Sequence, residues 1–111
     1  MKKLYIVVNK DITMTPAKLG VQIGHACTTF TLAKTKSIHF LEWYHKSNQV
    51  KIILKASQKH LEDLEELGYT TIRDAGKTEL PPNTITCVVL GINTKEHFTK
   101  SLKQFKRWRL A

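Results

Sequence analysis

Four residues of this chain carry side chains that can take part in acid–base and electrostatic catalysis. Lys18, Gln22 and His25 supply an amine, a carboxamide and an imidazole, and Asp74 supplies a carboxylate. Such chemistry needs a group that takes or gives a proton, and it needs positive charge or hydrogen-bond donors where negative charge develops. The four residues include a candidate for each of these roles.

The first three candidates belong to one predicted helix. Thr15 followed by Pro16 is a helix-start signal and predicts a helix over residues 16–33. At about 100° per residue, Lys18, Gln22 and His25 share one helix face. A cation near a helix N-terminus is disfavoured by a few tenths of a kcal/mol, so stability alone does not explain Lys18. For this helix taken alone, a solvated face is the simpler interpretation, and the other segments must decide.

Two glycines lie on the back of the same helix. Gly20 and Gly24 each cost about 1 kcal/mol relative to alanine and leave a flat surface there. This pair predicts that something packs very close, either a strand or a second subunit.

Apolar periodicity predicts strands alternating with helices. The predicted strands are Leu4–Val8, Val50–Lys55, Tyr69–Ile72 and Ile85–Ile92, with Phe105–Leu110 as a candidate fifth, short edge strand. Further helices are predicted from a Ser37 cap to Lys46, from a Ser57 cap to Gly68, and from a Thr94 cap to Lys103. The inward-facing residues are expected to be Ile38, Leu41 and Trp43 or Tyr44 in the second helix, and Leu61, Leu64 and Leu67 in the third. We expect Leu4–Val8, which is apolar throughout, to be a central strand in a three-layer α/β/α domain.

Length and charge limit the classes of function. The 111 residues predict a single domain, 1–111, and the formal net charge of +9 suits a phosphate-rich partner. Positive charge gathers near the C-terminus at Lys95, Lys100, Lys103, Lys106, Arg107 and Arg109, with Glu96 opposing. The alternative for this cluster is a solubilising surface. We expect Cys27 and Cys87 to be buried, reduced thiols, and we expect a cytoplasmic protein because neither a membrane helix nor a signal peptide is recognisable.

The segment 73–78 follows a predicted strand, at a position where α/β folds place ligand sites. Its Gly-Lys-Thr ending suggests a phosphate loop. That motif requires a glycine where this chain has Thr71, and a helix where it has Leu80-Pro81-Pro82. The spacing therefore excludes a nucleoside triphosphate site.

Two blocks of the sequence resemble the signature blocks of the type II peptidyl-tRNA hydrolase family. They are residues 18–26, and residues 72–80 together with 82–86. They come in family order, and the resemblance extends from the first strand to the basic C-terminus. It implies a mixed central sheet of four or five strands with helices on both faces, and commonly a homodimer. The activity it implies is hydrolysis of the ester that joins a nascent peptide to the terminal ribose of tRNA, without a metal or other cofactor.

The resemblance also implies site residues. The active-site lysine, glutamine, histidine, aspartate and threonine of the family match Lys18, Gln22, His25, Asp74 and Thr78, and Thr84 or Thr86 would line the site. Arg73 and Lys77 are candidates for phosphate binding or for loop structure, and Arg107 and Arg109, beside Trp108, are candidates for contact with RNA. Ala17 replaces a glycine usual in the family, and the segment 105–111 is more basic and aromatic than the usual ending.

Our hypothesis for the chemistry assigns each residue a role. Asp74 orients and deprotonates a water, Lys18 stabilises the oxyanion or fixes Asp74, and Gln22 and Thr78 position both. His25 helps in proton transfer or hydrogen-bonds within the wall of the site. One alternative is a non-catalytic module that binds tRNA, other RNA or a protein on the same scaffold. Another is a deacylase that clears mischarged tRNA.

Overall fold

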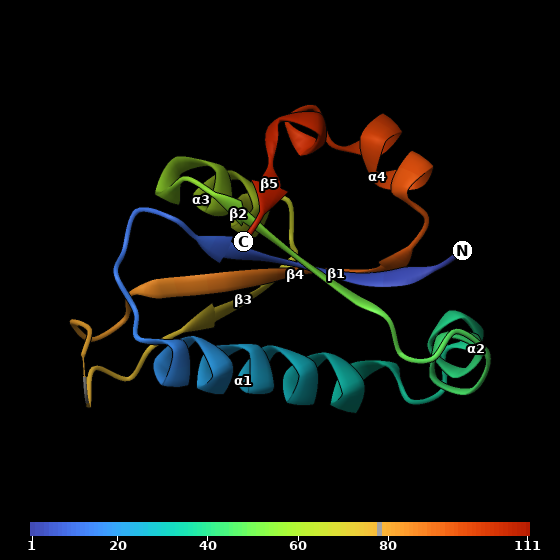
Figure 1. Cartoon of the computed structure of the whole chain (residues 1–111), viewed down its shortest axis with the longest axis horizontal. Helices are drawn as coiled ribbons and strands as arrows, with labels where there is room; N and C mark the ends of the chain where they lie inside the picture. The colour runs from blue at the N-terminus through green and yellow to red at the C-terminus, as the bar shows by residue number, and fades with distance from the viewer. Residues whose placement is uncertain (78) are drawn as a thin grey trace.

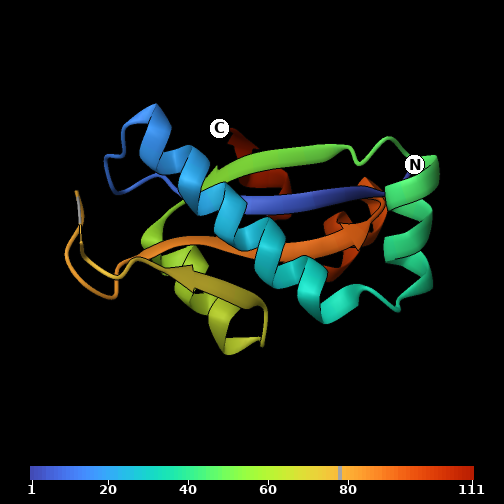
Figure 2. The same ribbon diagram turned by 90° about the horizontal axis from the view of Figure 1, so that it is seen from below.

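The first strand, β1 (Lys3–Asn9), is the middle strand of a mixed sheet in the computed structural model, which describes residues 1–77 and 79–111. Within these residues the sheet has five strands in the order β3-β4-β1-β2-β5 (Figures 1 and 2). The others are β2 (Lys51–Ala56), β3 (Thr70–Arg73), β4 (Ile85–Asn93) and β5 (Arg109–Leu110). β1 and β2 are parallel, and the remaining neighbours pair antiparallel. The predicted mixed sheet and the central first strand are confirmed.

Helices cover both faces of the sheet, as Figure 1 shows. They are α1 (Pro16–Lys34), α2 (Ile38–Lys46), α3 (Gln58–Glu66), α4 (Lys95–Ser101) and a 3-10 turn, η1 (Phe105–Arg107). Successive side chains of a strand point to opposite faces. Accordingly Leu4 and Ile6 pack with α1 and α2, whereas Tyr5 and Val7 pack with α3, α4 and η1. The three-layer α/β/α prediction is confirmed, and no described helix has the length and apolar character to cross a membrane.

Each α-helix begins at a predicted cap. The hydroxyl oxygens of Thr15, Ser37, Ser57 and Thr94 accept hydrogen bonds from the backbone N–H three residues later. Such caps satisfy an amide that the helix itself leaves without a partner. The helix starts are therefore set by local sequence, and α1 in particular begins where the Thr15-Pro16 signal predicts.

The inner face of α2 differs from the prediction. Phe40 and Trp43 are buried, whereas Ile38 is 63% and Leu41 38% exposed. Phe40 packs on Phe30 of α1, and the Trp43 indole N–H donates to the Val50 carbonyl at 2.8 Å. These two contacts fix the rotation of α2 about its own axis. The side of the helix that carries Ile38 and Leu41 therefore faces solvent. The prediction is confirmed for Trp43 and wrong for Ile38 and Leu41.

Gly68 closes α3 as predicted, but the predicted inward-facing Leu67 and the predicted end of α4 are wrong. Leu67 is 68% exposed because α3 ends at Glu66, and Gly68, at φ +96°, turns the chain toward β3. α4 ends at Ser101, not Lys103. The predicted edge strand 105–110 starts as the turn η1, which places the buried Phe105 ring against Tyr5 at 5.5 Å between centroids. Only its last two residues form β5.

The two helix glycines are exposed. A Cβ at Gly20 or Gly24 would meet no described atom within 4 Å outside the helix itself. The expectation that a strand of this chain packs there is therefore wrong.

Candidate active site

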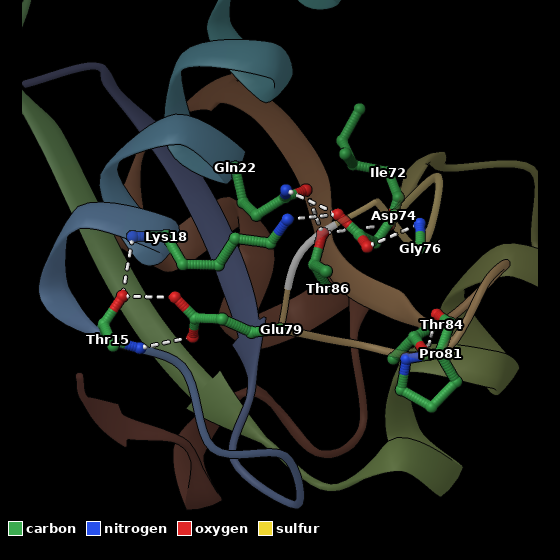
Figure 3. A network of polar contacts seen from close by, with 10 residues as sticks. All are labelled: Thr15, Lys18, Gln22, Ile72, Asp74, Gly76, Glu79, Pro81, Thr84 and Thr86. Atoms are coloured by element: carbon green, nitrogen blue, oxygen red, sulfur yellow. Dashed lines mark hydrogen bonds and ion pairs between the residues drawn. The ribbon is translucent and has the colours of Figure 1, made fainter.

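Lys18 and Asp74, separated by 56 residues, form an ion pair with 2.6 Å between Nζ and Oδ1 (Figure 3). Lys18 lies in the first turn of α1, which follows β1, and Asp74 directly follows β3. Since β1 and β3 both run antiparallel to β4, they end at the same edge of the sheet. The two side chains are only 11% and 5% exposed. The amine and the acid therefore meet, as the hypothesis that Lys18 fixes Asp74 requires.

Three donors from the described part of the chain hold the Asp74 carboxylate. Besides Lys18, Gln22 Nε2 donates to Oδ1 at 3.3 Å and the Gly76 N–H donates to Oδ2 at 2.7 Å. The hydrogen bond from Lys18 is the main cause that lowers the pKa of Asp74 below its usual value, and the Gly76 N–H lowers it further against the opposing effect of burial. Asp74 is therefore ionised at neutral pH.

Gln22 is 1% exposed, so a solvated helix face is the wrong interpretation for this residue. The buried hydroxyl of Thr86 in β4 donates to Gln22 Oε1 at 2.8 Å. This bond orients the amide with its NH₂ group toward Asp74, as Figure 3 shows. Thr86 thus acts on the site through Gln22.

The loop after Asp74 returns to the sheet beside it. The Asp74 N–H donates to the Thr84 carbonyl at 2.8 Å, and the Asn83 N–H donates to the Asp74 carbonyl at 2.7 Å. Gly76 has φ +78°, and a Cβ there would lie 2.6 Å from Pro82. Only glycine fits this position, and it brings the amide of residue 76 to the carboxylate.

Glu79 is a site residue that sequence reasoning missed. Its carboxylate accepts from the Thr15 N–H at 3.0 Å and from the Thr15 hydroxyl at 2.6 Å, and these bonds lower the pKa of Glu79. Thr15 is the N-cap of α1. The loop that carries Asp74 is therefore tied to the helix that carries Lys18. The one indication in the sequence was that an acidic residue without a proposed role lies only five residues after Asp74.

The remaining catalytic candidates lie apart from this network or cannot be placed. His25 is exposed on α1, about 10 Å along the helix axis from Lys18. Its imidazole forms no hydrogen bond with a described residue. Thr78 lies outside the described residues.

The four candidate phosphate contacts lie in two separate parts of the molecule. Arg73 and Lys77 are at the end of β3 and in the loop after it, whereas Arg107 and Arg109 are in the C-terminal segment. The Arg73 guanidinium donates to Glu65 at 2.6 Å and to the Asn83 carbonyl at 2.9 Å, which favours the loop-structure alternative for Arg73. Lys77 is exposed in the loop. Arg107 and Arg109 are exposed in η1 and β5, whose buried neighbours belong to the sheet face opposite α1.

Neither a metal cluster nor a reactive thiol is found at the described positions. No three His, Cys, Asp or Glu side chains of residues 1–77 and 79–111 are arranged to hold a metal ion. Both cysteines are free, and burial raises the pKa of Cys87 to about 12. The thiol of Cys87 is therefore inert at neutral pH.

Comparison with known proteins identifies the family. Residues 2–108 match the family model described as peptidyl-tRNA hydrolase PTH2. A peptidyl-tRNA hydrolase of Thermococcus onnurineus is 40% identical over 98 residues, covering 80% of this chain and 82% of the relative. The Thermoplasma acidophilum peptidyl-tRNA hydrolase is 31% identical over 115 residues, covering 96% and 97%. On the strength of these matches along almost its whole length, the chain belongs to the peptidyl-tRNA hydrolase PTH2 family.

Proposed function

We propose that this chain hydrolyses the ester of peptidyl-tRNA and releases free tRNA and peptide. The family match over residues 2–108 supports the reaction. The observation that carries the assignment of the site is the ion pair between Lys18 and Asp74, with 2.6 Å between charged atoms at the edge of the sheet. A nearly buried pair drawn from two distant segments is an arrangement that pKa-tuned active sites use.

In the proposed reaction, a water held by Asp74 attacks the ester carbonyl carbon. A bond forms between the water oxygen and that carbon, and the bond from the carbon to the ribose oxygen breaks. One water proton passes by way of Asp74 to the departing ribose oxygen, and the peptide acid loses the other to solvent. The lowered pKa makes Asp74 a weak base, so its larger contribution is to orient the water.

The hydrogen bonds of Asp74 indicate which oxygen holds the water. A carboxylate has about four acceptor positions, two on each oxygen. Lys18 and Gln22 occupy both positions on Oδ1, and Gly76 is the donor to Oδ2 in the described part of the site. Oδ2 is therefore the oxygen assigned to the water.

The neighbouring residues position this pair. Lys18 fixes Asp74 through the ion pair, and in the transition state its positive charge also faces the oxyanion. Gln22 holds Asp74 in place through its amide, and the same positioning role is proposed for Thr78 from the family resemblance. His25, exposed on the same helix, is assigned to the substrate and its proton transfer, and not to Asp74.

Several residues are proposed to contact tRNA. Thr84, Lys77, Arg107 and Arg109 are accessible for this role, and Arg73 contributes by shaping the loop. Thr86 is fully buried and supports the site through Gln22. We further propose a homodimer located in the cytoplasm, and sedimentation should give twice the 12.7-kDa chain mass.

The test is release of free tRNA from an N-acetylated aminoacyl-tRNA. Lys18→Ala and Asp74→Asn should each lower kcat/KM by roughly ten- to a hundredfold, the loss of about one transition-state interaction. Asp63→Asn and Lys34→Ala, at exposed sites on α3 and α1, are charge-matched controls and should keep wild-type rates.

Three results would contradict parts of this proposal. Wild-type rates in both site variants would reject the assigned pair. Tight tRNA binding without turnover by the wild-type protein would indicate a non-catalytic binding module. Equal cleavage of unblocked aminoacyl-tRNA would indicate a deacylase of mischarged tRNA.

A further inference from the structure

A second feature lies on the face of the sheet opposite α1. It is a groove of about 980 Å³ bordered by α4, η1 and β5, here called the α4 groove. Its floor is the part of the sheet where β1 and β2 begin, because strand alternation turns Tyr5, Ile52 and Leu54 to this face. Leu110 of β5 pairs directly with Leu54 and so lies on the same face. Figure 1 shows α4, η1 and β5 together on the side of the sheet away from α1.

The α4 groove and the Lys18–Asp74 pair lie at different ends of the sheet. β4 begins beside Asp74, since its first residue pairs with Arg73, and it ends at Asn93, which pairs with Lys3 at the start of β1. α4 follows that far end of β4 and contributes one wall of the groove. The groove is therefore a feature separate from the candidate active site.

The rim of the α4 groove is basic. Glu96 is the one acid among its described lining residues. Arg109 also borders the groove, but its side chain belongs to the other face, because it pairs with Lys55. The rim cations are four lysines that form no ion pair with any residue of 1–77 or 79–111, namely Lys3, Lys95, Lys100 and Lys106. These uncompensated charges favour a negatively charged occupant.

Tyr5 adds a hydroxyl that forms no hydrogen bond with another described residue. Tyr5 is only 3% exposed, and its ring packs edge-on against Phe98 and Phe105, with centroids 5.1 and 5.5 Å away. The one fully buried side-chain oxygen or nitrogen without a partner in the described part of the chain is Gln104 Oε1. The Tyr5 hydroxyl must therefore keep access to solvent, and the groove that Tyr5 lines provides it. Burial and the charge of Glu96 raise the pKa of Tyr5, so the hydroxyl remains a donor.

The floor of the α4 groove suits a protein segment better than RNA. Single-stranded RNA is held by stacking its bases on exposed aromatic rings. Tyr5 and Phe105 are buried, and Trp108 is partly buried against Phe105. The accessible apolar surface is instead aliphatic, at the half-buried Ile52 and at Leu110, which is 69% exposed. Aliphatic side chains of a protein complement such a surface, because their burial removes apolar area from water.

A second copy of this chain is a poor match for the same groove. The chain has a formal net charge of +9, so most of its surface would bring further cations to the four rim lysines. Like charges placed together across an interface suppress the association. The charge of the rim therefore favours an acidic partner over self-association.

We propose that the α4 groove binds an acidic segment of a partner protein. An aliphatic side chain of the segment packs on Ile52 and Leu110, and a carboxylate accepts from the Tyr5 hydroxyl among the rim lysines. This interaction surface goes beyond the proposed hydrolysis and does not depend on it.

The test measures the binding of fluorescent peptides by fluorescence anisotropy. The probe is a short peptide of glutamate and leucine, and a comparison peptide has serine in place of leucine. The groove variants are Lys95→Gln/Lys100→Gln, Leu110→Ser and Tyr5→Phe. The matched controls change exposed residues in and just after α1, and they are Lys34→Gln/Lys36→Gln and Leu32→Ser. Binding of deacylated tRNA and sedimentation of the free proteins are measured in parallel.

We expect the wild-type protein to bind the leucine-containing peptide saturably, and the serine peptide roughly tenfold more weakly. Lys95→Gln/Lys100→Gln should weaken peptide binding by roughly three- to tenfold, because two exposed charge contacts are lost. Leu110→Ser should weaken it by roughly threefold or more. Both control variants should bind the peptide as the wild type does.

Tyr5→Phe is the sharpest of the variants. It keeps the ring contacts with Phe98 and Phe105 and removes only the hydroxyl. Peptide binding should weaken by roughly tenfold, the loss of one hydrogen bond to a charged group. The melting temperature should stay unchanged, because the hydroxyl has no partner in the described part of the free protein. A destabilised Tyr5→Phe would show that the hydroxyl serves the fold and would contradict its role as the donor.

Several results would overturn the inference. Equal binding of the two peptides, or equal losses in groove and control variants, would reduce the interaction to attraction by net charge. A loss of tRNA binding in Lys95→Gln/Lys100→Gln that exceeds the loss in Lys34→Gln/Lys36→Gln would assign the groove to RNA. A dimer that Leu110→Ser dissociates would place a second copy there. The rate of peptidyl-tRNA hydrolysis enters none of these measurements, so the proposed function can fail or hold independently.

Discussion

The Thr86 hydroxyl donates to Gln22 Oε1 at 2.8 Å, and this bond determines which end of the Gln22 amide faces Asp74. An amide can present either its oxygen or its NH₂ group to a neighbour. With the oxygen engaged by Thr86, the NH₂ group is directed to the carboxylate. A residue with no accessible surface therefore helps to orient the Gln22 amide at the candidate active site.

Thr86→Val should impair both stability and catalysis. Valine keeps the shape but leaves the Gln22 oxygen without its donor in a fully buried position, which costs about 1–3 kcal/mol of unfolding free energy. The amide then loses one of the hydrogen bonds that hold it against Asp74, its Nε2–Oδ1 bond is less firmly oriented, and kcat should fall. Chemical denaturation and single-turnover hydrolysis measure the two effects. Thr86→Ser keeps the hydroxyl and is the control; equal losses in both variants would show that packing, not the hydrogen bond, is responsible.

Lys18→Met should move the acid limb of the pH–rate profile to higher pH. The Lys18 hydrogen bond is the largest contribution that lowers the pKa of Asp74 from 3.8, and burial opposes it. Without the lysine, the burial effect persists and Asp74 is protonated at a higher pH. The residual kcat/KM of the variant should therefore decline in an acidic range where the wild-type rate is still constant. Superimposable acid limbs would show that Asp74 is not the titrating group.

The same shift predicts the direction of a stability change. Because the pKa of Asp74 is lower in the folded than in the unfolded chain, the ionised carboxylate stabilises the fold above about pH 4. This contribution is lost as the pH falls through the lowered pKa. The difference in unfolding free energy between the wild-type protein and Asp74→Asn should accordingly shrink on acidification, as followed by urea denaturation at a series of pH values.

Glu79→Ala should reduce kcat more than it alters KM. Its carboxylate ties the Asp74 loop to Thr15 at the start of α1 through two hydrogen bonds. Loosening this tie lets Lys18 and Asp74 move from their positions in the structure, and a decrease in kcat of roughly tenfold is expected. Steady-state kinetics separate the two parameters. Glu62→Ala, at an exposed site on α3, is the matched control, and a similar loss in both variants would rule out a positioning role for Glu79.

Gly76→Ala should destabilise the protein, while Gly20→Ala should stabilise it. At residue 76 a methyl group would lie 2.6 Å from Pro82 at a φ of +78°, and such strain costs about 1–3 kcal/mol. At residue 20 the added methyl meets no described atom outside the helix, and alanine gains about 1 kcal/mol of helix propensity. Thermal unfolding measures both changes. A destabilised Gly20→Ala would indicate that the glycine face is covered in solution, as a subunit contact would do.

Local sequence alone determined most of the elements. The caps at Thr15, Ser37, Ser57 and Thr94 start helices where they were predicted, because a hydroxyl at the helix start satisfies an amide that has no other partner. The continuous apolar run of β1 predicted a strand covered on both faces. Short-range patterns carry this information because caps and strand periodicity involve only neighbouring residues.

The contacts between these elements were decided by the tertiary structure. Which side of α2 faces the sheet depends on Phe30 and the Val50 carbonyl, both outside α2, so its apolar residues alone predicted the wrong face for Ile38 and Leu41. The sequence and its family resemblance indicated Lys18 and Asp74 as partners. The anchoring by Glu79 and the orienting role of Thr86 depend on side chains that meet only when the strand order brings their segments to one edge. A hydrogen bond acts over about 3 Å, and no spacing along the chain specifies which distant atoms come within that distance.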